Sequence, residues 1–317
     1  MFNLSKAAKL RLQLFWSSTF LLLTPLSQAV PSKPIKIMVP IGFLKSLEGM
    51  LEEDPSFTDG RDYFLPVDKC IPISKIKEFN FGRPVLDFLI HCEVVRFNKL
   101  GDTIQVIQAP NNIRAIKMLS VGVADAFSMS EFPSVINQLN ETNLSLSDPV
   151  LRQGEFEVGF FTAPNRPEVL AIKSVYELMN LTSITATQWI RDDSELNKLT
   201  TRPHVLVSNH RKIPNMIAKK RADFTTNALN KKYVYNLDGE IVLTRIDGFK
   251  LSLPGTRVFV VNSKSKGYFD ALQAYIRGHR NQINSNEDGI FNAFKDIGWI
   301  SPHYKDWILL NDYFENK

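Results

Sequence analysis

The sequence has few cysteines and no long apolar run after its N-terminal region. It contains two cysteines, Cys70 and Cys92, and no C-x-x-C redox motif. In an oxidising compartment this pair allows one disulfide, which would add about 3 kcal/mol of stability. Two separate buried thiols are the alternative. No stretch beyond the first thirty residues approaches the ~20 apolar residues that a membrane span requires.

Recognised catalytic motifs are also missing. The five histidines are scattered, without the i,i+4 spacing of a zinc-binding helix. There is no G-x-S-x-G turn and no glycine-rich phosphate loop. Two Ser-x-x-Lys stretches, Ser74–Lys77 and Ser263–Lys266, lack the companion motifs of the penicillin-binding enzymes. The sequence therefore predicts no catalytic residue, no metal ligand and no cofactor.

The N-terminal segment predicts export. Three basic side chains precede an apolar run, Leu12–Leu26, and Ser27-Gln28-Ala29 supplies the small residues that a signal peptidase recognises. We expect a signal peptide over residues 1–29, cut after Ala29, and a periplasmic or secreted protein; an uncleaved anchor is the alternative. Loss of the three basic charges lowers the formal net charge from +5 to +2. This near-neutral balance disfavours a nucleic-acid partner.

Strands and helices alternate twice along the rest of the chain. The second alternation spans residues 155–229, and a further strand and two helices follow it. This order is typical of parallel α/β sheets. A chain of about 290 residues is longer than one hydrophobic core usually supports, so we expect two lobes. The predicted boundaries are 30–149 and 253–317 for the first lobe and 150–252 for the second.

Two helix-to-strand turns, "VADAFSMSEF" and "RADFTTNAL", have the same design. We interpret Asp125 and Asp223 in these turns as structural, each satisfying local backbone donors. In open α/β sheets, ligands bind beyond the carboxyl ends of strands, so the polar residues that follow each turn are candidates for a binding site. Aromatic residues near strand ends are candidates for stacking on a ligand. The predicted ligand-binding residues are Phe43, Ser128, Ser130, Glu131, Thr187, Trp189, Arg211, Thr225, Thr226 and Asn227.

The order of these parts resembles a known family. "KIMVP", "GVADAFSMS", "LSLSDPVLRQGEFEVGFFTAP", "MIAKKRADFTTNAL" and "GTRVFVVNSKS" follow one another as in the extracytoplasmic solute-binding proteins of the polar amino-acid transport type, which have the type II periplasmic-binding fold. The resemblance covers the whole chain after the signal peptide. It implies two lobes, each a mainly parallel sheet flanked by helices, joined by crossing hinge segments near Ser147–Arg152 and Ser252–Val258.

The resemblance also implies a function. It predicts a monomeric, non-catalytic protein that closes on a small polar solute and presents it to the permease of an ABC transporter or to a sensor kinase. Two alternatives remain open at this point. One is a dehydratase-like enzyme on the same scaffold, with Glu131 as its titrating carboxylate, and the other is an orphan scaffold that acts through protein contacts.

The sequence departs from the family at the residues that anchor an amino acid. The family usually has an arginine for the carboxylate about ten residues after the first Ala-Asp turn, where this chain has Asn137 and Gln138. It usually has an aspartate for the ammonium five residues after the second turn, where this chain has Ala228. Arg152 or Arg211 could take the place of the missing arginine. The solute therefore stays unidentified.

Overall fold

The structure is a computed structural model that describes residues 33–41, 43, 63–79, 82–229, 231–236, 239–280, 289–300 and 304–311. The predicted signal peptide, residues 1–29, lies outside this part of the chain. Within it, every helix is too short or too polar to cross a bilayer.

The first sheet has six strands, in the order β2-β3-β1-β4-β12-β5. Strand β1 pairs in parallel with β3 and β4, whereas β2, β12 and β5 join the sheet antiparallel. The predicted strand–helix alternation is thus confirmed in the centre of this sheet. The strands span Ile35–Pro40 (β1), Tyr63–Pro66 (β2), Thr103–Ala109 (β3), Ala126–Phe127 (β4), Leu144–Leu146 (β5) and Val260–Asn262 (β12).

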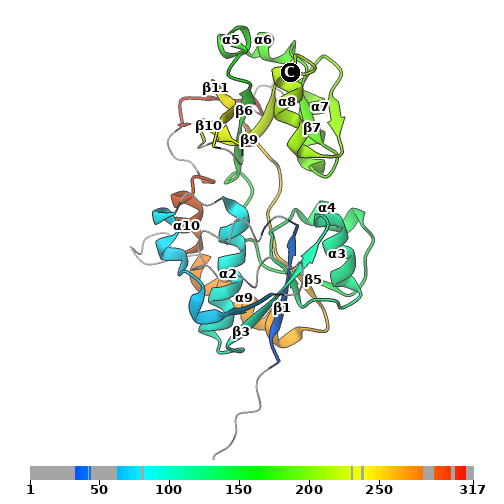
Figure 1. The fold of residues 1–317 in the computed structure, drawn as a ribbon, viewed down its shortest axis with the longest axis vertical. Coiled ribbons are helices and arrows are strands. Elements are labelled where there is room, and N and C mark those ends of the chain that lie inside the picture. The colour runs from blue at the N-terminus through cyan, green and yellow to red at the C-terminus, as the bar shows by residue number, and fades with distance from the viewer. Residues whose placement is uncertain are drawn as a thin grey trace, which may run out of the picture. The chain divides into compact units, whose positions relative to one another are not determined.

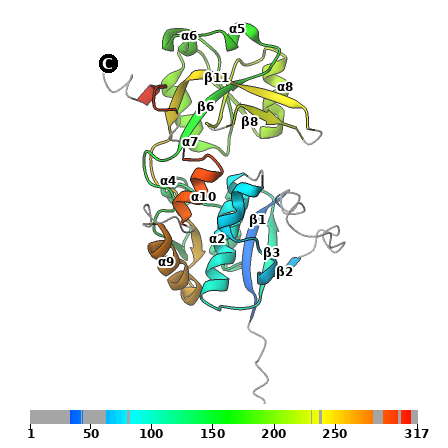
Figure 2. The same cartoon turned by 90° about the vertical axis from the view of Figure 1, so that its left-hand side faces the viewer.

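Helices cover both faces of the first sheet (Figure 1). Successive side chains of a strand point to opposite faces, so Ile37 and Val39 of β1 pack in the same core as helix α2, whereas Met38 packs with α3. Helices α9 and α10 pack beside α2 (Figure 2). The helices span Arg83–Phe97 (α2), Asn112–Ser120 (α3), Pro133–Gln138 (α4), Lys266–Arg280 (α9) and Ile290–Asp296 (α10).

The second sheet runs in the order β10-β11-β6-β9, and β13 also pairs with β11. Its main pairings are antiparallel, so the expectation of a mainly parallel second sheet was wrong for these strands. A five-residue connection between β10 and β11 is too short for a parallel crossover and requires an antiparallel hairpin. The strands span Glu157–Thr162 (β6), Thr225–Ala228 (β9), Tyr233–Tyr235 (β10), Ile241–Ser252 (β11) and Ile308–Leu309 (β13).

Apart from the parallel β11–β13 pair, the parallel pairing described in this half belongs to a small group of strands beside the second sheet. Strand β7 (Ile184–Ala186) pairs in parallel with β8 (Val205–Val207), and Ser183 forms a parallel bridge with Phe224 just before β9. The strand–helix repeat read from the sequence corresponds to this group. The helices of this half span Pro167–Leu170 (α5), Val175–Met179 (α6), Ile190–Leu199 (α7), His210–Lys212 (η4) and Ile213–Ala218 (α8).

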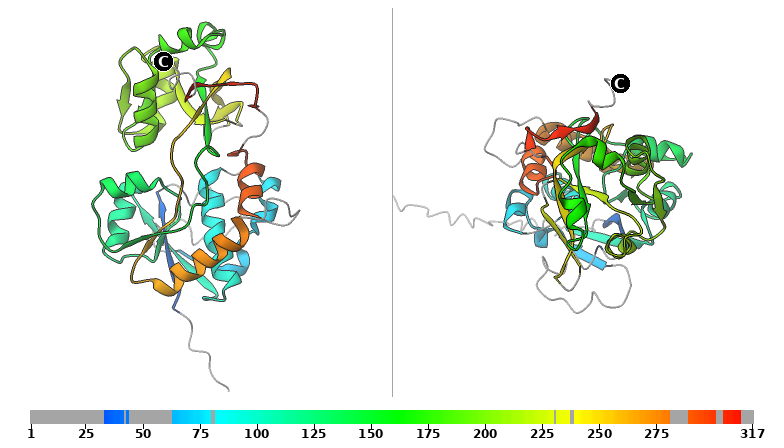
Figure 3. Two further views of the ribbon diagram at one scale, coloured as in Figure 1. Left: turned by 180° about the vertical axis from the view of Figure 1, so that it is seen from behind. Right: turned by 90° about the horizontal axis from the view of Figure 1, so that it is seen from above.

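Two extended segments carry the chain from the first sheet to the second and back. One connects β5 to β6, the other connects β11 to β12, and they lie side by side (Figure 3). The Val150 amide donates to the Arg257 carbonyl at 2.9 Å, and the Arg257 amide donates to the Leu151 carbonyl at 2.8 Å. These segments coincide with the two predicted crossings. The proposed lobe boundaries remain a prediction, because residues Lys33–Lys317 form one compact unit.

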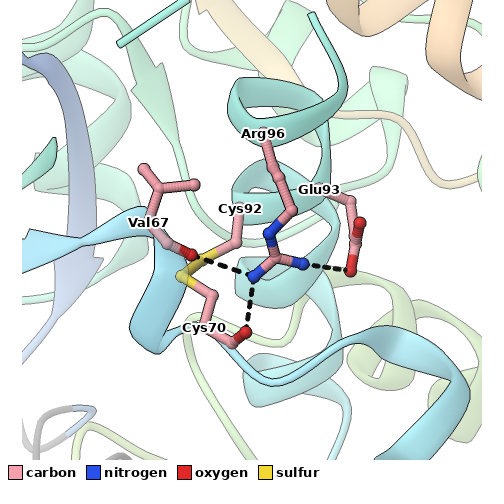
Figure 4. Close-up of a disulfide and its surroundings, with 5 residues drawn as sticks. All are labelled: Val67, Cys70, Cys92, Glu93 and Arg96. Atoms are coloured by element: carbon pink, nitrogen blue, oxygen red, sulfur yellow. Dashed lines mark hydrogen bonds and ion pairs between the residues drawn. A yellow bond between two sulfur atoms is a disulfide. The ribbon is translucent and has the colours of Figure 1, made fainter. Parts of the chain in front are cut away.

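Cys70 and Cys92 form a disulfide, as one of the two sequence readings predicted (Figure 4). The bridge ties the connection between the short helices η2 (Val67–Lys69) and η3 (Ile73–Glu78) to helix α2. Arg96 of α2 reinforces the link, because its Nη2 donates to the Val67 carbonyl at 2.9 Å and to the Cys70 carbonyl at 2.5 Å.

Candidate functional site

A groove of about 860 Å³ opens on the second half of the chain. It is formed by the ends of β6 and β9, the β10–β11 hairpin, helix η4 and helix α8. This volume is in the usual range for small-molecule sites. Five of the ten residues predicted from the sequence line the groove: Trp189, Arg211, Thr225, Thr226 and Asn227.

Strand β9 contributes three consecutive polar residues to the lining of this groove, and their side chains alternate between the two faces of the strand. Thr225 is 2% exposed, and its Oγ1 has no hydrogen-bond partner in the part of the chain that the structure describes. Thr226 is equally buried, and its hydroxyl donates to Asp192 Oδ1 at 2.6 Å. An unpaired buried hydroxyl costs about 1–3 kcal/mol. Because this oxygen is shielded from solvent, a ligand atom in the groove could pair with it only after a local rearrangement.

Trp189 and His210 form an aromatic wall. Trp189 directly precedes helix α7, and its ring stacks on His210 with centroids 5.7 Å apart and planes 29° apart. Partial burial and the positive charge of Arg211 lower the pKa of His210, so the imidazole is neutral at neutral pH. The exposed Arg211 guanidinium supplies positive charge beside this wall. Asn209 holds helix η4 in place by accepting a hydrogen bond from the Arg211 amide at 3.0 Å.

Ser130, at the equivalent strand end of the first half, lies in a buried charged network. The Ser130 amide and hydroxyl both donate to Asp87 Oδ2, at 2.9 and 3.0 Å. Arg83 Nη1 donates to the same carboxylate oxygen and to the Ser130 carbonyl, both at 2.8 Å. Burial raises the pKa of Asp87, and the Arg83 charge opposes this rise. The Ser130 hydroxyl is therefore held by the protein itself.

Arg257 connects this network to Thr226. Its Nη1 donates to the Ser130 carbonyl at 2.9 Å. Burial, and secondly repulsion from Arg83, lower the pKa of Arg257 to about 10. Burial also raises the pKa of Asp192, opposed first by its hydrogen bond from Thr226 and then by the charge of Arg257. Arg257 thus interacts with Ser130 on one side and with the Asp192–Thr226 pair on the other.

Sequence reasoning missed Arg83, Asp87, Asp192 and Arg257. Arg257 is the one with a visible signal, since it is a charged residue inside the apolar stretch "GTRVFVVNS". It is 8% exposed, and its Nε has no hydrogen-bond partner among the described residues. Phe132 and Phe156 pack over the guanidinium, with centroids 4.2 and 4.9 Å from Cζ.

The other predicted residues lie away from the groove lining. Phe43 is 5% exposed and packs on Phe88, with ring centroids 5.3 Å apart, in the core of the first half. Glu131 accepts a hydrogen bond from Asn112 Nδ2 at 2.7 Å. Ser128 is fully buried, and Thr187 is exposed.

A serine–histidine–aspartate arrangement lies elsewhere in the second half. Ser183 Oγ is 2.7 Å from His204 Nδ1, and His204 Nε2 is 3.2 Å from Asp193 Oδ1. Ser183 is fully buried next to strand β7, so no substrate carbonyl can reach its hydroxyl. This trio is a structural network. Within the described residues, no group of three or more His, Cys, Asp or Glu is arranged to hold a metal.

Comparison with known proteins gives structural similarity alone. No protein-family model matches the sequence, and no curated protein matches it. One similar structure is an amino acid ABC transporter substrate-binding protein from Streptococcus pneumoniae bound to L-arginine. It has 13% identity and a TM-score of 0.45, and the match covers 83% of this chain and 96% of that one.

Two further similar structures are a VFT2 domain and a ligand binding core. The VFT2 domain of BvgS from Bordetella pertussis has 15% identity and a TM-score of 0.47, with 84% of this chain and 93% of that one covered. The GluR0 ligand binding core in complex with L-glutamate has 11% identity and a TM-score of 0.48, with 85% and 99% covered. At these values the similarity does not identify a ligand or an activity for this chain.

Proposed function

We propose that this chain is an exported, non-catalytic binding protein that holds a small polar solute in the groove beside strand β9. The observation that carries the proposal is the assembly of five sequence-predicted residues in one groove, with the unpaired Thr225 hydroxyl among them. Buried donors without a protein partner are expected where a ligand supplies the missing acceptor.

The buried charged network supports the part of the proposal that involves both halves of the chain. Ser130 and Thr226 follow equivalent turns. Arg257 of the crossing segment donates to the Ser130 carbonyl, and its charge acts on Asp192, the hydrogen-bond partner of Thr226. Closure of two lobes about the crossing segments is favoured when a solute contacts groups on both sides. The closed form is then recognised by a membrane permease or a sensor kinase, with the binding protein acting as a monomer.

The dehydratase-like alternative has less support. It needs Glu131 near the bound solute, and Glu131 is not among the described residues that line the groove. Its Oε1 instead accepts from Asn112, and its Oε2 lies 4.0 Å from Arg257 Nη1.

Native mass spectrometry of freshly purified protein, followed by a thermal-shift screen of metabolites, tests the proposal. A solute at 100 times its Kd adds about 2.7 kcal/mol of stability. We expect Thr225→Val to lower the affinity for that solute by about tenfold, because one hydrogen bond of roughly 1.4 kcal/mol is lost.

Thr185→Val is the matched control. Thr185 is also fully buried with an unpaired Oγ1, but it lies on β7 outside the groove lining. Its substitution should leave the affinity unchanged. If the two substitutions change the affinity equally, or if no solute is found whose affinity depends on groove residues, the groove is not the binding site.

A further inference from the structure

We infer that the solute is a flat, amphipathic organic acid, and that the groove discriminates against the same molecule carrying an α-ammonium group. This inference rests on the proposed function and specifies its substrate class. The residues that line the groove supply three separate reasons.

The first reason is the apolar surface of the groove. Strands β10 and β11 contribute Val234, Tyr235 and Ile241, and helix α8 contributes Ile213. Tyr235 and Ile241 are 54% and 42% exposed. Apolar side chains gathered in a concave, water-accessible site are stabilised when an apolar ligand covers them. A small, fully polar solute would leave this surface exposed to water.

The second reason is the stacked Trp189–His210 pair. The indole and the imidazole present a planar wall next to the apolar surface. Flat rings gain from offset or tilted contact with such a wall. The wall therefore favours a planar body over a branched aliphatic one.

The third reason is the charge of the lining. Among the lining residues that the structure describes, Arg211 is the one permanently charged side chain, and none is Asp or Glu. A guanidinium binds a carboxylate with two parallel hydrogen bonds. An ammonium group in the same groove would lose water without gaining a paired anion, which is costly.

Among the described residues, two acidic side chains contact residues of this lining, and both already have partners. Glu240 Oε2 accepts a hydrogen bond from Asn236 Nδ2 at 3.0 Å. Asp192 Oδ1 accepts the Thr226 hydroxyl at 2.6 Å, and Asp192 is attracted by Arg257 and Arg83. An added ammonium would compete with these partners. The Thr225 hydroxyl has no partner among the described residues, but it is buried and could pair with the solute's oxygen only after a local rearrangement of the groove wall.

Isothermal titration of the purified protein with three matched compounds tests the inference. Hydrocinnamate is a phenyl-bearing carboxylate, L-phenylalanine is the same molecule with an α-ammonium, and hydrocinnamamide is its neutral amide. We expect hydrocinnamate to bind about tenfold or more tightly than either of the others, since one unpaired or missing charge costs at least roughly 1.4 kcal/mol.

Two exposed side chains provide the variants, so loss of folding does not confuse the result. Arg211→Gln should lower the affinity for hydrocinnamate by about tenfold and change the affinity for hydrocinnamamide by no more than about twofold. Lys212→Gln, at the neighbouring exposed position outside the lining, should change neither.

Three results would overturn the inference. They are binding of L-phenylalanine as tight as that of hydrocinnamate, equal binding of the amide, and no binding of any of the three. None of these contradicts the proposed function, because that is tested by the solute found on the native protein. A co-purified solute of another chemical class, whose binding is weakened by Thr225→Val, would refute the organic-acid inference and leave the proposed function intact.

Discussion

Asp125 and Asp223 make the same two backbone contacts in the two halves of the chain. The Asp125 carboxylate accepts from the Lys36 amide at 2.8 Å, and the Asp125 amide donates to the Lys36 carbonyl at 2.9 Å. Asp223 does the same with Thr182, at 2.7 Å for both bonds. The structural role of the two aspartates is confirmed, but the expectation of local backbone donors was wrong, because the donors lie 89 and 41 residues away in the sequence. Each aspartate fixes the start of a neighbouring strand and does not line the groove.

Substitution of either aspartate should therefore reduce stability without changing binding. We expect Asp125→Ala to lower the free energy of unfolding by about 1–3 kcal/mol, because it leaves the Lys36 amide without its acceptor. Asp223→Ala should cost more, since Arg166 is 4% exposed and loses an ion pair of 2.6 Å. Urea denaturation measures both values. An unchanged unfolding midpoint together with lost solute affinity would assign these residues to the binding site instead.

Phe156 and Trp299 form a stacked pair that connects a crossing segment to the C-terminal region. Their ring centroids lie 4.4 Å apart and their planes differ by 4°. Arg83 Cζ lies 5.1 Å from the Trp299 ring. A double-mutant cycle with Phe156→Leu and Trp299→Leu should give a coupling energy of about 0.5–1.5 kcal/mol. Phe156→Leu combined with the exposed Phe64→Leu is the control, and those two effects should add. Additive effects for the stacked pair would show that the contact does not stabilise the fold.

The disulfide should contribute measurably to stability. Its two cysteines are 22 residues apart, and closing a loop of this size removes unfolded-state entropy worth about 3 kcal/mol. Cys70→Ser combined with Cys92→Ser should lower the free energy of unfolding by this amount, as should reductant on the native sequence. Reductant added to the double variant is the control and should change nothing. Reaction of both cysteines with iodoacetamide in denatured, unreduced protein would contradict the bridge.

His91 should make the protein sensitive to mild acid. It is fully buried against Phe259 and Tyr268. Burial lowers the pKa of His91 from 6.5 to about 3, opposed by backbone hydrogen bonds. The unfolded chain therefore binds a proton as the pH falls below 6.5 while the folded chain does not. Stability contributed by neutral His91 is present above pH 6.5 and is lost toward pH 3 at about 1.4 kcal/mol per pH unit.

The measurement is the free energy of unfolding between pH 4 and 7. His91→Gln should flatten the slope over this range, because the amide keeps a polar contact but does not titrate. His279→Gln is the control and should retain the slope, since His91 is unchanged. A slope that survives in His91→Gln would place the acid sensitivity elsewhere.

Local sequence patterns predicted elements with clear periodicity and failed for those without it. The stretch "IRDDSELNKL" predicts a helix, and α7 spans these same residues. Helix α4 is six residues long, and its end overlaps the polar stretch 137–148, which predicts a connection without regular structure. Strand β11 is not predicted from the sequence; Asp247 and Gly248 interrupt its apolar alternation, and its pairing register with β6 shifts between Ile246 and Lys250.

The residues of the candidate site also differ in how far the sequence predicts them. Thr225 and Thr226 could be selected because they directly follow the Ala-Asp turn, although they begin strand β9 and do not lie beyond its carboxyl end. Asp87 and Arg257 meet Ser130 across 43 and 127 residues of chain. No periodicity or spacing in one sequence predicts contacts over such separations, so these side chains became visible only in the folded structure.

The last strand also limits how the molecule can move. Ile308 and Leu309 of β13 pair with Phe249 and Lys250 of β11, and Asn311 exchanges two hydrogen bonds with Ser252. Two connections alone would act as a hinge about which one sheet can twist against the other. The β11–β13 contacts are a third attachment, and the proposed closing motion would have to strain them or break them.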